Sequence, residues 1–328
     1  TCAAIGLVFF ARRMLEIKPD RSFSDVMERA LYNTVLAGMA ADGKSFFYVN
    51  PLEVYPKACH EDARKFHVKP IRQKWFGCAC CPPNIARLLS SLAMYAYTEN
   101  EDTLFAHLFV GGSVKKDVNG KELSFEVTTD MPWQGTTVYS CTNEQSVHGS
   151  LAIRIPEWSR SFKVSGVTGE LDENSAQLRD GYLYIAHDWR KGDTVSLELS
   201  MEPEFIAANN EVREDINKTA LRRGPFIYCI EEADNGTDLH TLSVCAAAKP
   251  ETVMMNIAGT DVAALRIDGK KLINVCDSPD VDAETKTAPL YTTLKKPEYK
   301  DVKLTYIPYY AWNNRGEGEM SVWVNYIL

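Results

Sequence analysis

The chain has 328 residues and a formal net charge of −8 at pH 7. With 45% hydrophobic and 24% charged residues it reads as an ordinary soluble globular protein, long enough for two or three domains. The acidic balance argues against nucleic acid or an anionic membrane as the main partner, because proteins that bind phosphates usually carry a basic face. Nine cysteines without a disulfide-like spacing favour a reducing compartment, and we expect a cytoplasmic protein.

The first hundred residues show helical periodicity. Residues 2–16 predict a buried helix whose apolar run is too short to span a bilayer. Ser24 is placed to cap a second helix, which Gly38 would end, and residues 46–52 form a short extended piece. The chain starts without a Met, as if cut into a helix, so we expect it to be the C-terminal part of something longer.

The segment 74–84 concentrates more chemistry than any other, with Cys78, Cys80 and Cys81 inside four residues. Adjacent cysteines bridge each other only through a strained ring, so a soft metal is the more natural partner. Two prolines follow, which suit a first helical turn, and apolar residues at helical spacing then predict a buried face through about Tyr97. The thiols thus stand at a helix N-terminus, which favours thiolate.

The competing reading of these thiols is simple packing, because free cysteine is among the most buried residue types. We apply that reading to the dispersed cysteines, which are Cys59, Cys141, Cys229, Cys245 and Cys276.

The sequence changes in character after residue 103. Alternating apolar runs, separated by turn residues, predict strands at 103–110, 123–127, 150–156, 182–185 and 194–199. Asn119-Gly120 and Asp180-Gly181 are favoured hairpin turns, so we predict an antiparallel sandwich. A second set of strands follows residue 203, at 220–230, 264–267, 302–310 and 320–326. The expected fold class is α+β multidomain, with domains at 1–97, 98–203 and 204–328.

Four stretches of the chain, 1–6, 30–33, 75–84 and 309–316, carry a family resemblance. Through them the sequence resembles the C-terminal half of the β-L-arabinofuranosidases of glycoside hydrolase family 127. The resemblance implies the C-terminal helices of an (α/α)6 barrel followed by two antiparallel β-sandwich domains. It also implies a Zn2+ site built from one glutamate and three cysteines, with one thiolate attacking the anomeric carbon of an L-arabinofuranose-containing oligosaccharide or glycoconjugate.

Carried over by position, the resemblance makes Cys2, Cys80 and Cys81 the metal thiolates and Cys80 the nucleophile. It places Glu28 and Tyr48 at the sugar pocket. Cys78 matches a family cysteine that is not a ligand, although spacing alone leaves a swap with Cys80 open. The zinc-binding glutamate and the acid/base glutamate of the family both precede Thr1, so we expect an incomplete site and an inactive fragment.

Other readings stay open. The sandwiches could bind carbohydrate or a partner beside a purely structural zinc, or the protein could be a relative with altered or lost activity. The chain could also form a homodimer. On residue type alone, Glu28 would be a solvated helix carboxylate and Tyr48 a core residue. We read His60 and His67 as solvated loop residues. We expect core positions for most of the tryptophans outside the cysteine segment, which are Trp133, Trp158, Trp189, Trp312 and Trp323.

Overall fold

The computed structural model describes residues 1–276, 291 and 293–327. They form two compact units. The first comprises 1–50, 72–204 and 222–227, and the second comprises 51–71, 205–221 and 228–328. Within the described residues, no helix combines the length and the apolar character that crossing a membrane requires.

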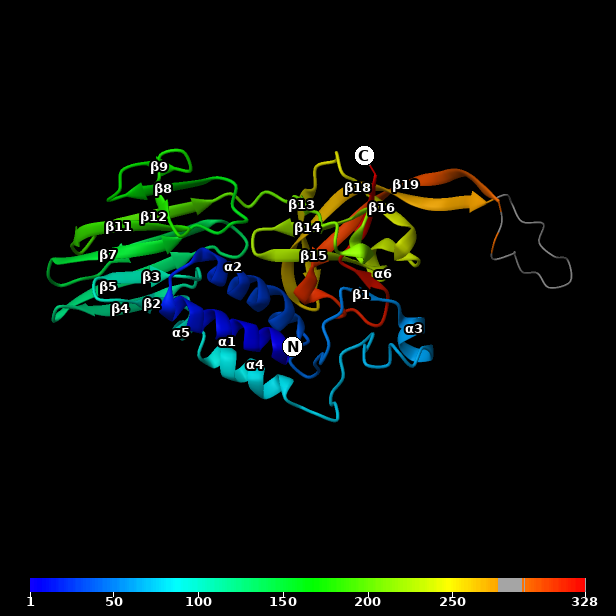
Figure 1. Ribbon diagram of the computed structural model, residues 1–328, viewed down its shortest axis with the longest axis horizontal. Helices are drawn as coiled ribbons and strands as arrows, with labels where there is room; N and C mark the ends of the chain where they lie inside the picture. The colour runs from blue at the N-terminus through cyan, green and yellow to red at the C-terminus, as the bar shows by residue number, and fades with distance from the viewer. Residues whose placement is uncertain (277–290, 292, 328) are drawn as a thin grey trace, which may run out of the picture. The chain divides into compact units, whose positions relative to one another are not determined.

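Helices begin the first unit, and Figure 1 shows α1 (Cys2–Ile17), α2 (Arg21–Arg29) and α4 (Cys81–Ser90) packed beside one another. α2 continues as a π-helical turn over Ala30–Val35. Apolar residues at helical spacing on α1 and α4 face a common core, which contains Ile5, Val8, Leu15, Ile85 and Leu88. The predicted helix over 2–16 is confirmed, because its apolar stripe is the face that becomes buried.

Three local predictions in this region are wrong. α2 begins at Arg21, since the Asp20 carboxylate accepts from the Ser22 backbone N–H at 3.0 Å and so takes the capping role expected of Ser24. The helix expected to reach Tyr97 ends at Ser90 and resumes as the short α5 (Ala93–Ala96). In the second unit, His60, which we expected in a loop, lies in the helix α3 (Pro56–Glu61).

A β-sandwich completes the first unit. Its five-stranded sheet has the order β10 (Leu178–Arg179), β11 (Tyr182–Trp189), β7 (Val147–Arg154), β3 (Thr103–Ala106) and β2 (Tyr97–Glu99). Its six-stranded sheet has the order β4 (Gly112–Val118), β5 (Lys121–Thr129), β6 (Thr136–Cys141), β12 (Thr194–Leu199), β8 (Phe162–Gly166) and β9 (Leu171–Asp172). Both sheets contribute to one core, which confirms the predicted sandwich, although β3 and β7 pair in parallel.

The second unit, for which the sequence predicted a second sandwich, contains one ten-stranded sheet, and a hairpin pairing between two of its strands closes the sheet into a barrel-like ring. Along the sheet the order is β1 (Glu53–Val54), β20 (Met320–Ser321), β15 (Phe226–Glu231), β19 (Leu294–Pro308), β18 (Thr260–Cys276), β16 (Leu242–Cys245), β21 (Val324–Ile327), β14 (Lys218–Arg223) and β13 (Glu204–Ile206), and β17 (Glu251–Ile257) pairs with β18. The run 220–230, expected as one strand, is a hairpin that turns at Gly224, whose φ is 56°.

Candidate functional site

Two helix N-termini bring three cysteines together. Cys2 is the first residue of α1, Cys80 is the N-cap of α4 and Cys81 is its first residue. The Sγ atom of Cys2 lies 3.1 Å from that of Cys80 and 3.6 Å from that of Cys81. All three sulfur atoms fall within 4.8 Å of one another. The structure therefore places the three residues expected to bind zinc in one cluster.

Backbone and side-chain hydrogen bonds fix the start of α1. The Thr1 nitrogen donates to the Tyr48 carbonyl at 2.8 Å, and the Thr1 hydroxyl donates to the Phe47 carbonyl at 2.7 Å. Gly38 permits this approach, because a Cβ there would lie 2.6 Å from the Thr1 Cγ2. The Asn84 amide of α4 donates to the Cys2 sulfur at 3.3 Å. These contacts hold Cys2 against α4.

The donor set fits a soft cation such as zinc. Thiolates bind zinc at about 2.3 Å, and a tetrahedral arrangement separates two such sulfurs by about 3.8 Å. The Cys2 sulfur lies 3.6 Å from that of Cys81, near this value, and 3.1 Å from that of Cys80, so the Cys2 and Cys80 sulfurs would have to move apart to hold zinc. Among the described residues the cluster holds thiols alone, with no carboxylate or imidazole in it. A fourth ligand would therefore have to come from a group outside this cluster.

Without a bound cation, the surroundings of the three thiols shift their pKa values in different directions. Partial burial raises the pKa of Cys2, but the hydrogen bond from Asn84 and the hydrogen bonds shared with Cys80 and Cys81 outweigh burial and lower that pKa. The hydrogen bond to Cys2, together with burial and Cys78, raises the pKa of Cys80 to about 12. Burial and then the bond to Cys2 raise the pKa of Cys81. One sulfur can thus ionise with help from its neighbours, and a bound cation would have to ionise the others.

Tyr48 lies beside this cluster. Its side chain is 43% exposed, so the core position that residue type suggested is wrong. Negative charge on Cys80 and Cys78, and a hydrogen bond to Cys80, raise the pKa of the Tyr48 phenol. The Phe76 ring packs 5.9 Å from the Tyr48 ring. The structure thus brings Tyr48 to the thiols, and its contact with a sugar stays a prediction.

Glu28 has a different environment from either sequence-based expectation. It is 1% exposed, so it is not a solvated helix carboxylate. One of its oxygens bonds the Arg154 guanidinium, and the other accepts from the Trp158 indole at 2.7 Å. Arg154 also donates to Asp25 at 2.6 Å. A sugar hydroxyl would have to compete with these partners, so the expected sugar contact of Glu28 stays a prediction.

Sequence reasoning missed this buried ion network. Arg154 is 126 residues from Glu28 and 129 from Asp25 along the chain, so no local spacing could connect them. Burial alone would lower the pKa of Arg154, but the charges of Glu28 and Asp25 outweigh burial and raise it. The network joins α2 to the sandwich within the first unit.

Most of the remaining cysteines, histidines and tryptophans occupy the core or surface positions that we expected for residues without a catalytic role. Cys78 is exposed and lies outside the three-thiol cluster. Cys59, Cys141 and Cys229 are buried, whereas Cys245 is half-buried and the Cys276 side chain lies outside the described residues. His60 and His67 are exposed, and the His60 ring lies 2.7 Å from Glu317. Trp158, Trp189 and Trp312 are buried, as expected for core residues, while Trp133 and Trp323 are half-buried.

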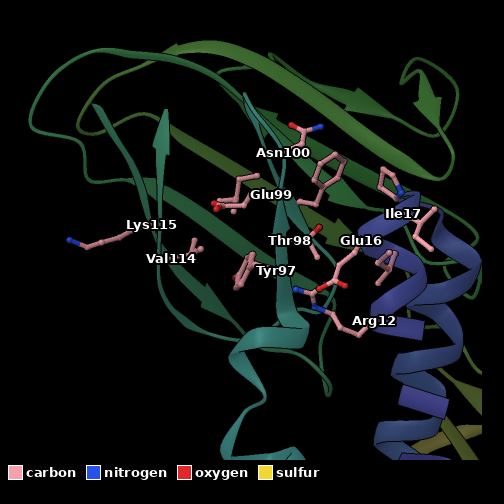
Figure 2. A pocket seen from close by; sticks show the side chains of 13 residues that line it. Arg12, Glu16, Ile17, Tyr97, Thr98, Glu99, Asn100, Val114 and Lys115 are labelled. Carbon is pink, nitrogen blue, oxygen red and sulfur yellow. The ribbon is translucent and has the colours of Figure 1, made fainter. Parts of the chain in front are cut away.

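A cavity of about 440 Å³ lies where the end of α1 meets β2 and β4. Figure 2 shows the Arg12 and Glu16 side chains directed toward each other at its edge, where they form an ion pair of 2.9 Å. Glu99 and Lys115 are also among its lining residues. None of the residues that the sequence assigned to the site lines this cavity.

Family models match three consecutive parts of the chain. The GH127 catalytic domain of β-L-arabinofuranosidase matches residues 1–94 and the GH127 middle domain matches residues 103–201. The C-terminal domain of glycoside hydrolase family 127 matches residues 203–325. A likeness to the C-terminal half alone is therefore not borne out, because the matches include the catalytic domain and extend over the whole chain.

Individual relatives agree with the family models. A non-reducing end β-L-arabinofuranosidase of Bifidobacterium longum is 35% identical over 98% of this chain and 48% of its own length. The solved structure of a GH127 β-L-arabinofuranosidase from Geobacillus stearothermophilus T6 has a TM-score of 0.91 and 43% identity, over 99% of this chain and 49% of that one. Another, described as a GH127 β-arabinofuranosidase, has a TM-score of 0.83 and 31% identity over 99% and 49%.

The chain spans about half the length of these relatives. Over that half, the order of helices, sandwich and second sheet follows the order of the three matched domains. The four stretches singled out in the sequence fall within the matched ranges. On these matches, the chain belongs to glycoside hydrolase family 127.

Proposed function

We propose that this chain supplies the zinc–thiolate part of a retaining β-L-arabinofuranosidase. The observation that carries the proposal is the convergence of the Cys2, Cys80 and Cys81 sulfurs within 4.8 Å. Bound zinc would keep these thiols ionised, which is the chemistry a thiolate nucleophile requires. The names of the relatives support the sugar, because those relatives are described as β-L-arabinofuranosidases.

In this proposal Cys80 is the nucleophile. Its sulfur forms a bond to the anomeric carbon while the bond from that carbon to the leaving oxygen breaks, and an acid donates a proton to the leaving oxygen. Water then cleaves the thioglycoside with that acid acting as base, so the sugar keeps its configuration. Cys2, Cys80 and Cys81 would hold the metal. The Asn84 N–H orients Cys2, and the Tyr48 hydroxyl beside Cys80 would bind the sugar.

The cluster of thiols supplies no proton donor for the leaving oxygen and no fourth ligand. We therefore propose that the chain by itself is inactive and that both groups belong to a longer protein, with helices 1–97 forming part of an (α/α)6 barrel. The division at 1–97, 98–203 and 204–328 is part of the same proposal. A cytoplasmic, reducing location would keep the three thiols available to a metal.

Metal binding tests the proposal directly on this chain. We expect elemental analysis to find about one zinc ion per chain, and cobalt substitution to give thiolate-to-metal absorption. Cys81→Ser should weaken metal binding, whereas the matched control Cys59→Ser, at a buried cysteine outside the cluster, should leave it unchanged. Equal effects of the two substitutions on the affinity for added zinc or cobalt would refute the zinc site. Turnover of an aryl β-L-arabinofuranoside by the chain alone would refute the proposed inactivity.

A further inference from the structure

A second cavity, of about 260 Å³, lies beside the first turn of α4. Its wall includes Phe46, Trp75, Pro82 and Leu89, together with the side chains of Lys44 and Lys74. Pro82 directly follows Cys81, so the cavity begins one residue from the thiol cluster. Pockets for drug-sized ligands usually measure about 300–1,000 Å³, so this cavity has the size for a single small ring.

Trp75 gives the cavity an exposed aromatic surface. Its side chain is 72% exposed, which is unusual for the largest apolar residue. The segment that carries it is anchored, because the Phe46 backbone N–H donates to the Gln73 carbonyl at 2.9 Å and the Gln73 N–H donates back at 3.0 Å. Phe76, which directly follows Trp75, packs its ring 5.0 Å from the ring of Phe46. The indole is therefore held on fixed backbone, as a stacking surface should be.

The charged residues that line the cavity are of one sign, although the Asp42 carboxylate next to them accepts from the Lys44 backbone N–H at 3.0 Å. Lys44 and Lys74 are both exposed, and no acidic residue is among the described residues that line the cavity. The chain as a whole carries a net charge of −8, so this is a local reversal. Two lysines and an exposed indole on the wall of one cavity match a ring that has an apolar face and a carboxylate.

We propose that this cavity binds a uronic acid residue of a glycan. The ring stacks on Trp75, and its carboxylate pairs with Lys44 and Lys74. The glycan nature of the ligand rests on the proposed glycosidase function, but the binding itself requires neither metal nor turnover. The site would select substrates in which an acidic sugar lies next to the bond that is cleaved.

The test is direct binding to the full chain, with methyl α-galacturonoside as the probe and methyl α-galactoside as its neutral counterpart. Tryptophan fluorescence and calorimetry report Kd at low and at 0.5 M salt. We expect the acidic probe to bind about tenfold more tightly than the neutral one at low salt, and to lose this advantage at high salt. Lys44→Met with Lys74→Met should weaken binding of the acidic probe about tenfold.

Two controls separate the site from general charge and from folding. Lys121→Met with Lys191→Met removes the same charge from exposed positions of the sandwich and should leave Kd unchanged. Trp75→Ala should abolish the fluorescence response and weaken binding of both probes, with circular dichroism confirming that the variants stay folded. Equal affinity for the two probes, or equal Kd in both double variants, would overturn the proposal. Failure of the chain to bind metal, with this binding pattern intact, would count against the proposed zinc–thiolate mechanism and not against the uronic acid site.

Discussion

Arg154→Met should destabilise the first unit more than any surface change. Arg154 is fully buried and bonds both Asp25 and Glu28, which are 9% and 1% exposed. Removing the guanidinium leaves Glu28 buried without a cation and leaves Asp25 with only the longer ion pair to Arg21, at 3.8 Å. Breaking a buried ion group in this way costs about 3–5 kcal/mol. A domain has only about 5–15 kcal/mol of stability in total, so the loss is a large part of it.

The rest of the network provides a compensating variant. Replacing all three charges, with Arg154→Met, Asp25→Asn and Glu28→Gln together, removes the unpaired charge as well as the cation. Neutral replacement of a whole buried ion group is often close to neutral in stability. We therefore expect the triple variant to recover at least half of the stability that Arg154→Met loses. Asp25→Asn or Glu28→Gln made alone in the wild-type chain would only remove a bond to Arg154.

Urea unfolding measures this effect. Because the chain has two compact units, hydrogen exchange in peptides from β7 and β11 should be the readout, since both strands belong to the first unit. Arg160→Met is the matched control, because Arg160 is 68% exposed where it pairs with Glu204, and such a pair is worth about 0–1 kcal/mol. A loss below about 1 kcal/mol for Arg154→Met, or no recovery in the triple variant, would refute the reasoning.

Further expectations concern pH and glycine. Burial, followed by the positive charges of Arg154 and Arg12, lowers the pKa of His107 from 6.5 to about 3. Below pH 6.5 the imidazole is therefore protonated in the unfolded chain but stays neutral in the folded chain. Stability should fall by about 2 kcal/mol between pH 7 and pH 5 through this group, and His107→Gln should remove that part of the slope in urea midpoints at the two pH values. Gly6 lies in α1 with no atom within 4 Å of an added Cβ, so Gly6→Ala should raise stability by about 0.5–1 kcal/mol. A Cβ on Gly135 would lie 1.9 Å from the Leu199 carbonyl oxygen, so Gly135→Ala should cost about 1–3 kcal/mol in thermal unfolding, and a neutral result would contradict the packing.

Local sequence signals predicted what local forces determine. The apolar stripe of α1 is buried as its spacing required, and Asn119 and Gly120 adopt the positive φ values, 54° and 77°, that their hairpin turn demands. The start of α2 was misplaced because Asp20 and Ser24 both have capping side chains. In the structure the Ser24 hydroxyl lies 2.6 Å from the Tyr182 hydroxyl, 158 residues away, and so hydrogen-bonds a distant strand and not the start of its own helix.

The spacing of residues in the sequence could not predict contacts between segments that are far apart along the chain. Asn33 belongs to a stretch that carried the family resemblance, but its role was not evident. In the structure its amide donates to the Pro225 carbonyl at 2.9 Å and accepts from the Ile227 N–H at 2.8 Å, so one side chain serves as a strand partner for the β15 hairpin. The thiol cluster was found only because Cys80 and Cys81 are adjacent, while Cys2 entered through the family resemblance.

The position of the thiols at two helix N-termini was expected to favour thiolate by itself. A helix terminus contributes about 0.3–1 kcal/mol to a nearby charge, which is less than one unit of pKa. The neighbouring thiols have the larger effect, because the protein groups together raise the pKa of Cys80 to about 12. The helix termini therefore place the sulfurs close together but do not ionise Cys80. A proposed nucleophile at this position depends on a cation bound by the same cluster, so metal binding and nucleophilicity should be lost together when Cys2 or Cys81 is replaced.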